Sequence, residues 1–145
     1  MDAIGDLTLD ARHAIGLVAA VVFGALIGLE RQLRKNPAGL HTNALVALGA
    51  AAYVIAGVMI GEATGPARVA GQVVTGVGFL CAGLIWHEGG TVRGINSAAT
   101  VWCSCAVGVF AGLGMLLWAA VVTVLVVLAN VVLHRIEHRI SGETP

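Results

Sequence analysis

The chain has 145 residues, of which 58% are hydrophobic and only 11% charged, and it carries no formal net charge at pH 7. Its mean hydropathy is +0.92. An ordinary soluble domain has about 25% charged residues, so this composition excludes a soluble globular protein and predicts an all-α integral membrane protein. The apolar residues form several long runs, which excludes a single anchor on a soluble domain. The N-terminal segment lacks the basic stretch of a secretory signal peptide, so we expect it to be mature sequence.

Five apolar runs predict five transmembrane helices in one transmembrane domain covering residues 1–145. They lie at residues 12–30, 44–61, 69–86, 98–113 and 115–133. A helix needs about 20 residues to cross the hydrocarbon core, so the fourth run is short, and the fourth and fifth spans are expected to be tightly joined. Residues 134–145 would then form a short cytoplasmic tail with no soluble C-terminal domain.

The basic residues predict the orientation of the chain, because Lys and Arg are retained on the cytoplasmic side of a membrane. With the N-terminus outside and the C-terminus inside, six of the eight Lys and Arg residues lie inside. The six are Arg31, Arg34, Lys35, Arg93, Arg135 and Arg139, and the two outside are Arg12 and Arg68.

An internal repeat relates two parts of the chain. A shift of 55 positions lays residues 16–57 over residues 71–112 with twelve identities and no gap, although a chain so rich in Gly, Ala and Val also gives chance matches. A duplication predicts two parallel helical hairpins plus a fifth helix. It pairs His41 with Asn96 and Thr42 with Ser97, at the starts of two helices whose N-terminal ends would frame a cytoplasmic-side pocket for an anion or carboxylate.

Small residues recur at helical spacing in three pairs, namely Gly24 with Gly28, Gly57 with Gly61, and Gly108 with Gly112. Such Gly-x-x-x-Gly pairs let helix backbones approach closely in a membrane. They predict either packing within the chain or the interface of a homo-oligomer such as a dimer, and the sequence leaves both open.

Polar side chains inside the predicted spans are few. Asn96, Thr100 and Cys103 follow one face of the fourth span, and Gln72 and Thr75 lie one turn apart in the third, which predicts two facing polar stripes. Polar groups in lipid are costly unless buried and partnered, so such a row marks a helix contact or a functional cavity. The alternative is purely structural: Asn96 or Ser97 caps the helix and Thr100 bonds back to a carbonyl.

Two glutamates lie near the cytoplasmic ends of spans, Glu30 with Arg31 nearby and Glu88 with Arg93 nearby. Ion pairs are one expectation. The other is that the two carboxylates help to hold Mg²⁺, which often takes only one or two carboxylates and keeps most of its waters.

The rest of the inventory argues against catalysis. Cys103 and Cys105 are two apart on a helix and point in different directions, and Cys81 is in another span, so we expect small buried hydrophobes rather than a metal site. The sequence has no nucleophile-and-base pair, no phosphate loop and no nucleic-acid-binding patch. We therefore expect neither an enzyme nor a nucleic-acid-binding protein, and no cofactor apart from Mg²⁺ as a possible ligand or transported ion.

Two segments resemble the hallmark blocks of the MgtC/SapB family of bacterial inner-membrane proteins. They are GALIGLERQLRKNPAGLHTNALVALGAA (24–51) and GVGFLCAGLIWHEGGTVRGINSAATVWCSCAVGVFAGLG (76–114). The resemblance implies five spans with a cytoplasmic C-terminus in the inner membrane, and it attaches importance to Glu88, Asn96 and Cys103. His41 stands where an arginine is common in the family, which replaces a permanent charge with one that varies with pH.

The resemblance also implies a role in magnesium and stress homeostasis, including growth at low Mg²⁺ and survival of intracellular pathogens, which is a virulence trait. One implied action is that of a membrane regulator that binds the membrane sector of the F-type ATP synthase, and the other is that of a Mg²⁺ or other ion transporter. We favour the regulator, because the spans lack the mid-membrane carboxylate that Mg²⁺ transport normally requires. A third alternative is a binder of a small anionic or lipid ligand between the repeats.

Overall fold

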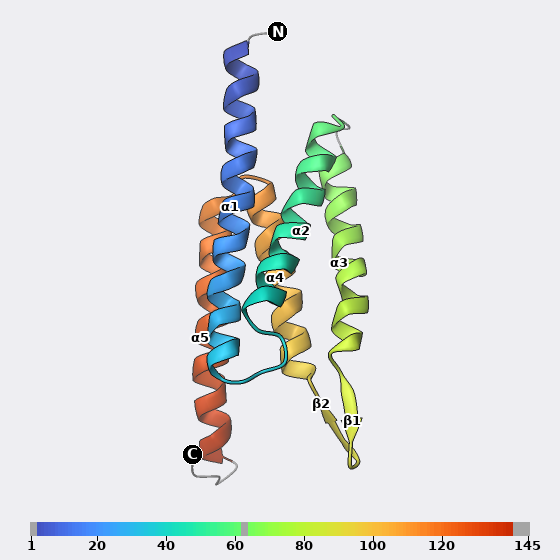
Figure 1. The fold of residues 1–145 in the computed structure, drawn as a ribbon, viewed down its shortest axis with the longest axis vertical. Helices are drawn as coiled ribbons and strands as arrows, with labels where there is room; N and C mark the ends of the chain where they lie inside the picture. Colours follow the sequence, from blue (N-terminus) through green and yellow to red (C-terminus); the bar gives the residue numbers. More distant parts are fainter. Residues whose placement is uncertain (1–2, 62–63, 141–145) are drawn as a thin grey trace.

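The computed structural model describes the backbone of residues 3–61 and 64–140, and the side chains of these residues except 3–8, 137 and 138. The described chain is an elongated bundle of helices with a short hairpin at one end (Figure 1). In chain order the elements are α1 (Ala3–Leu33), α2 (Leu40–Met59), α3 (Gly65–Gly83), β1 (Trp86–Glu88), β2 (Thr91–Arg93), α4 (Ile95–Gly112) and α5 (Leu116–Ile140).

Glycines bring α1 and α4 into direct backbone contact with α2. A Cβ added at Gly24 of α1 would lie 2.6 Å from the carbonyl oxygen of Asn43, and one added at Gly108 of α4 would lie 2.1 Å from the carbonyl oxygen of Ala47. Two of the Gly-x-x-x-Gly pairs therefore pack within the chain, which is the intramolecular alternative. The third predicted pair is not a helical pair, because α2 ends at Met59 and Gly61 has a left-handed φ of +80°. Self-association stays a prediction.

The core is built from small residues around α2 and α4. One cluster joins α1, α2, α4 and α5 through buried residues such as Ala20, Ala47 and Ala119, and a second joins α2, α3 and α4 through Val77, Val101 and Cys105. In Figure 1, α2 and α4 stand in the middle, with α1 and α5 to one side and α3 to the other. The result is that α3 contacts α2 and α4 but leaves much of its own surface open.

Four of the five described helices are long and apolar enough to cross a membrane, over Leu9–Leu33, Leu40–Met59, Ile95–Gly112 and Leu116–Ile136. The helix outside this set is α3, whose 19 residues include five glycines, Arg68 and Gln72. The all-helical prediction is thus confirmed, whereas the crossing by α3, the duplication and the orientation stay predictions. Residues 134–140 of the predicted tail continue α5, residues 141–145 lie outside the described residues, and the cytoplasmic place of the tail stays a prediction.

The predicted third span, 69–86, starts inside the helix α3 but was wrong at its C-terminal end. The helix begins at Gly65, with Pro66 in its first turn, and ends at Gly83, after which Trp86–Glu88 and Thr91–Arg93 pair as an antiparallel hairpin. Gly89 and Gly90 form the turn with φ values of +58° and +84°. Two adjacent residues with positive φ match the right-handed twist of the strands, and glycine adopts this conformation without strain.

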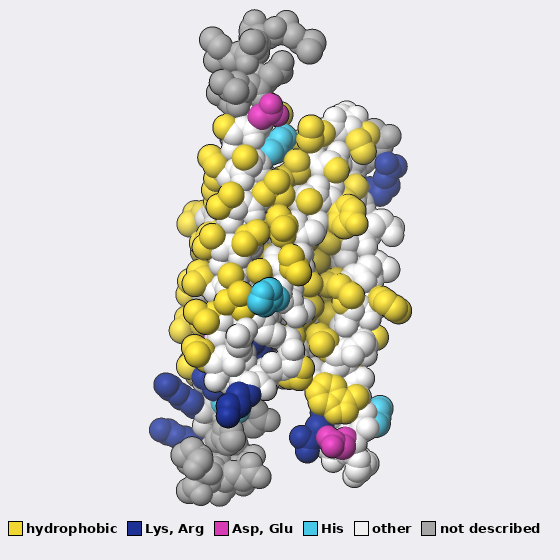
Figure 2. All heavy atoms as spheres, in the orientation of Figure 1, with side chains coloured by type: hydrophobic (Ala, Val, Ile, Leu, Met, Phe, Trp, Pro, Cys, Tyr) yellow, Lys and Arg dark blue, Asp and Glu magenta, His cyan; other side chains and the backbone are white. Residues whose placement is uncertain are grey.

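The surface agrees with a membrane setting. Apolar side chains cover the face of the helices drawn in Figure 2, and Lys and Arg side chains gather at the ends, mostly at the end where α1 finishes. Many large apolar side chains are exposed, including Leu33 (76%), Phe79 (83%) and Leu117 (73%). A monomeric soluble protein rarely exposes apolar surface on this scale, so the exposed face is suited to lipid.

Candidate functional site

The predicted row of Asn96, Thr100 and Cys103 lines an open groove of about 410 Å³ between α4 and α5. From α5, Asn130 and His134 line the same groove, and small or apolar residues complete its walls, namely Ala99, Val126, Ala129 and Leu133. The row therefore turns toward α5, and not toward α3. Asn96 is exposed at the first turn of α4, Cys103 is half-buried and Thr100 is buried.

Thr100 connects the two walls of the groove. Its hydroxyl donates to the carbonyl oxygen of Asn96 at 2.9 Å, and Oγ1 of Thr100 also lies 3.4 Å from Oδ1 of the Asn130 side chain. The buried Nδ2 of Asn130 has no hydrogen-bond partner among the described residues. The back-bonding of Thr100 was the structural alternative and is confirmed, but the capping role of Asn96 or Ser97 was wrong, because α4 is capped by Gly94 without a side-chain bond.

A buried polar pair lies directly behind the groove. Asn43 of α2 is fully buried, and its amide donates to the carbonyl oxygens of Ala38 and Gly39, both at 2.9 Å. Ser104 of α4 donates to Oδ1 of Asn43 at 2.8 Å and lies 3.2 Å from the carbonyl oxygen of Thr100. In lipid such bonds hold helices together because no water competes for the polar groups. The groove wall formed by α4 is thereby anchored to α2 and to the loop before it.

Arg31 ties the end of α1 to the start of α4. It is only 2% exposed, and its Nη2 donates to the hydroxyl of Ser97 at 3.3 Å, while its buried Nε makes no hydrogen bond within the described chain. Glu30 pairs with Arg34 one turn later, and not with Arg31 as the sequence suggested. The Glu30 carboxylate is therefore already matched by a cation.

Glu88 occupies a different place. It lies on the exposed hairpin, where its carboxylate is 3.4 Å from Nε of Arg93, so the predicted ion pair of these two residues is confirmed. Glu30 and Glu88 lie on separate parts of the bundle, at the end of α1 and on β1, and each has its own arginine (Figure 1). Among the described residues no group of three or more His, Cys, Asp or Glu could hold a metal ion.

The two helix N-terminal ends expected to frame an anion pocket do not face each other. The bond between Asn43 and Ser104 joins positions 61 apart, whereas the repeat pairs positions 55 apart. The two registers differ by six positions, and a helix rises about 1.5 Å per residue. The start of α4 therefore lies about 9 Å away from the start of α2 along the bundle axis. His41 is exposed on the first turn of α2, Thr42 is half-buried beside it, and Arg31 fills the interior next to α4.

The second predicted stripe also lies elsewhere. Gln72 lines a separate groove between α2 and α3, and Thr75 is exposed and donates back to the carbonyl oxygen of Gly71 at 3.0 Å. The prediction that this stripe faces the one on α4 was wrong, because α3 contacts α4 through Val77 and Cys105. The predicted divergence of Cys103 and Cys105 is confirmed, and the three cysteines are free thiols.

Sequence reasoning missed the residues that complete the groove and its support. Asn130 and His134 were read as part of an apolar span and its tail, and Asn43 and Ser104 were not singled out at all. The usable signal was the cost of an asparagine inside a hydrophobic helix, which requires a partner. That signal applies to Asn130 and Asn43 as strongly as to Asn96.

Comparison with known proteins identifies relatives of this chain. The model of the MgtC family matches residues 17–139. Protein MgtC of Salmonella typhimurium strain LT2 is 47% identical over 129 residues, which are 89% of this chain and 55% of that protein. Protein MgtC of Brucella abortus strain 2308 is 50% identical over 123 residues, or 85% of this chain and 52% of that protein.

The chain thus spans about half the length of the curated relatives it matches. No solved structure matches it. The family model covers most of the membrane helices and both segments in which the resemblance was seen. On these grounds the chain belongs to the MgtC family.

Proposed function

We propose that this protein is a non-enzymatic membrane regulator of magnesium and stress homeostasis, and that it acts by binding a transmembrane helix of a partner in the groove between α4 and α5. The observation that carries this proposal is the place of Asn96, which is exposed in a groove on the side of the bundle. An ion path through the bundle would need that side chain in its interior. An amide on the side of a membrane helix is costly unless another molecule satisfies it.

The chemistry of the groove suits a helix better than an ion. Its polar groups are amides, a hydroxyl, a thiol and an imidazole, and no carboxylate is among the described residues that line it. Mg²⁺ prefers oxygen ligands that include carboxylates and gives up its waters reluctantly. Ala99 and Ala129 make the walls low, and small residues are those that let a second helix approach closely in lipid. The absence of carboxylates among these described residues and the small side chains together favour a docked helix with polar side chains.

The first candidate partner is the membrane sector of the F-type ATP synthase, as the family resemblance implies. Binding there would restrain ATP production or proton flow when Mg²⁺ is scarce. Adaptation to low Mg²⁺ and survival inside host cells would follow from this restraint. The expected setting is the bacterial inner membrane, with the N-terminus outside and the C-terminus in the cytoplasm.

The proposal can be tested by co-purification. Tagged protein is solubilised from bacterial membranes, and the ATP synthase membrane subunits that accompany it are quantified. Asn96→Leu should remove them, because it replaces the exposed amide of the groove. Thr75→Val is the matched control, since Thr75 is an exposed polar residue of α3 outside the groove. Equal recovery of the synthase with both variants would reject the groove as the docking surface.

The second candidate function is ion transport, and one observation favours it. The row of Asn96, Thr100 and Cys103 runs inward along the groove from the first turn of α4, and it could carry a hydrated ion if several copies assembled around it. Mg²⁺ flux into proteoliposomes under an imposed gradient tests this. A regulator gives no flux above empty vesicles, whereas flux that Asn96→Ala abolishes would establish a transporter.

A further inference from the structure

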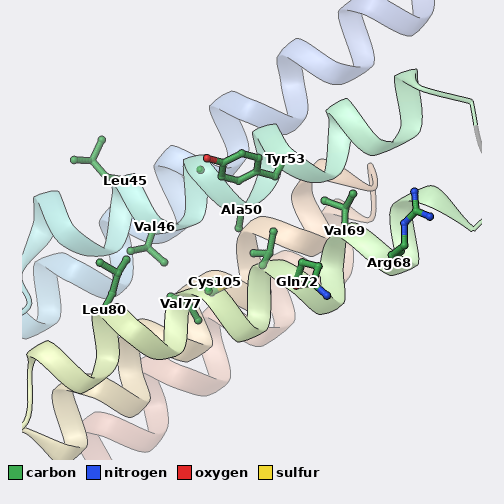
Figure 3. Close-up of a pocket in the computed structure, with 13 residues that line it drawn as sticks. Leu45, Val46, Ala50, Tyr53, Arg68, Val69, Gln72, Val77, Leu80 and Cys105 are labelled. Carbon is green, nitrogen blue, oxygen red and sulfur yellow. The ribbon is translucent and has the colours of Figure 1, made fainter.

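A second and larger groove, of about 610 Å³, opens between α2 and α3 on the other side of the bundle (Figure 3). Two contacts hold α3 in place at different levels. Near the start of α3, Val69 packs against Gly57 of α2, where a Cβ added to the glycine would lie 3.0 Å away. Near its end, the Cys81 thiol donates to the carbonyl oxygen of Ala98 on α4 at 3.3 Å. The groove lies between α2 and α3 and is lined by residues from Arg68 and Val69 to Leu80 of α3.

Missing side chains create the space. Gly49 of α2 and Gly76 of α3 both line the groove, and a Cβ added to either would meet nothing within 4 Å. The walls around them are mainly aliphatic, and Val77 and Cys105 close the floor. If such a groove stayed empty, the atoms that line it would lack the dispersion contacts of a filled core, and apolar walls do not hold ordered water. In a membrane such a groove is therefore filled by hydrocarbon or by protein.

The polarity of the groove changes along its length. Figure 3 shows Leu45 and Leu80 at one end, Tyr53 and Gln72 near the middle, and Arg68 at the other end. The Arg68 end is the end of the bundle where α2 finishes and α3 begins, so it lies toward a membrane surface. The groove is apolar toward the membrane interior, then polar, and ends at a cation. A phospholipid has the matching sequence of parts: an apolar acyl chain, polar ester groups and an anionic phosphate.

We propose that this groove binds an anionic phospholipid, with one acyl chain between α2 and α3 and the headgroup phosphate beside Arg68. Tyr53 and Gln72 then lie at the level where the chain meets the polar headgroup region. Basic side chains near the membrane surface attract anionic lipids, and a guanidinium presents several donors to phosphate oxygens. The site is separate from the α4–α5 groove, and the proposal is independent of the proposed regulatory function.

The test is native mass spectrometry of the purified full chain, titrated in detergent with phosphatidylglycerol or with phosphatidylcholine of identical acyl chains. We expect one bound phosphatidylglycerol with an affinity about fivefold above that of phosphatidylcholine, which corresponds to about 1 kcal/mol for one basic residue near the surface. Arg68→Gln should reduce this ratio to about one. Gly76→Leu should abolish binding of both lipids at this site, because its side chain fills the slot.

Gly78→Leu is the matched control, because Gly78 lies on the same helix, has equally open space around its Cβ position and does not line the groove. Should Gly76→Leu fail to fold, Gly49→Leu fills the slot from α2. Binding that survives both filling variants, or a preference for phosphatidylglycerol that survives Arg68→Gln, would overturn the proposal. So would a dimer that forms without lipid and is lost on filling the slot, because the occupant would then be a second copy.

Discussion

Replacing Gly108 by alanine should destabilise the bundle strongly, although alanine is the better helix former. The added Cβ would lie 2.1 Å from the carbonyl oxygen of Ala47, where an ordinary contact is 3.4–4 Å, and the obstacle is backbone that no rotamer change can move. The two helices α2 and α4 must therefore separate by about 1 Å or more. Overpacking of this kind costs about 1–3 kcal/mol.

The separation of α2 from α4 has a second cost. The hydrogen bond from Ser104 to Asn43 spans the same interface at 2.8 Å and would be stretched or broken. A lost buried hydrogen bond costs about 1–3 kcal/mol, whereas the gain from replacing a helical glycine is at most about 1 kcal/mol. The net expected loss in the free energy of unfolding is about 1–5 kcal/mol, estimated from these ranges.

The assay is reversible unfolding of the purified protein in mixed micelles, with Gly78→Ala as the control. Nothing lies within 4 Å of a Cβ added at Gly78, so this variant should be as stable as the wild type or slightly more stable. The two variants make the same chemical change in a helix, so their difference isolates the close approach of α2 and α4. A Gly108→Ala protein as stable as Gly78→Ala would refute the packing described above.

Three further predictions concern other parts of the chain. Asn43→Ala should lower the free energy of unfolding by about 2–4 kcal/mol, more than Ser104→Ala, because Asn43 makes two further bonds to the loop before α2; equal losses in unfolding assays would contradict this. Gly94→Ala should impair folding, measured as the yield of monodisperse protein, because Gly94 has φ of +89° and its Cβ would lie 1.8 Å from the carbonyl oxygen of Leu84; a wild-type yield would count against it. Glu88→Gln should leave thermal stability and calorimetric Mg²⁺ binding unchanged, since its carboxylate is exposed and already paired; loss of Mg²⁺ binding would revive the two-carboxylate site.

The helical spans and the polar row on α4 could be predicted because both depend on local order along the chain. Long apolar runs predict membrane helices, and the spacing of Asn96, Thr100 and Cys103 places them on one face whatever surrounds the helix. The partner of that face could not be predicted in the same way. Asn130 lies 30 positions from Thr100, and which side of α5 turns toward α4 depends on packing between helices.

The hairpin shows a different limit. Trp86 was assigned to the third span because it extends an apolar run, yet the glycine pair that follows is a strong hairpin signal. The span was assigned from hydropathy alone, and hydropathy does not take the turn preference of a glycine pair into account. The stagger between α2 and α4 could not be predicted either, because it depends on the close contact of Gly108 with Ala47. The internal repeat pairs positions 55 apart, whereas the contacting residues of these two helices are 61 apart.

The most direct test of the account is site-specific photo-crosslinking in bacterial membranes. A photoreactive residue is placed at Ala99, in the groove between α4 and α5, or at Leu117, which is 73% exposed on α5 and lies outside that groove. If a partner helix docks in this groove, a discrete crosslinked protein is expected at Ala99 that is absent at Leu117 and is lost in the Asn96→Leu background. Crosslinks at Ala99 to lipid alone, or the same products at both positions, would contradict the claim that this groove binds a partner helix.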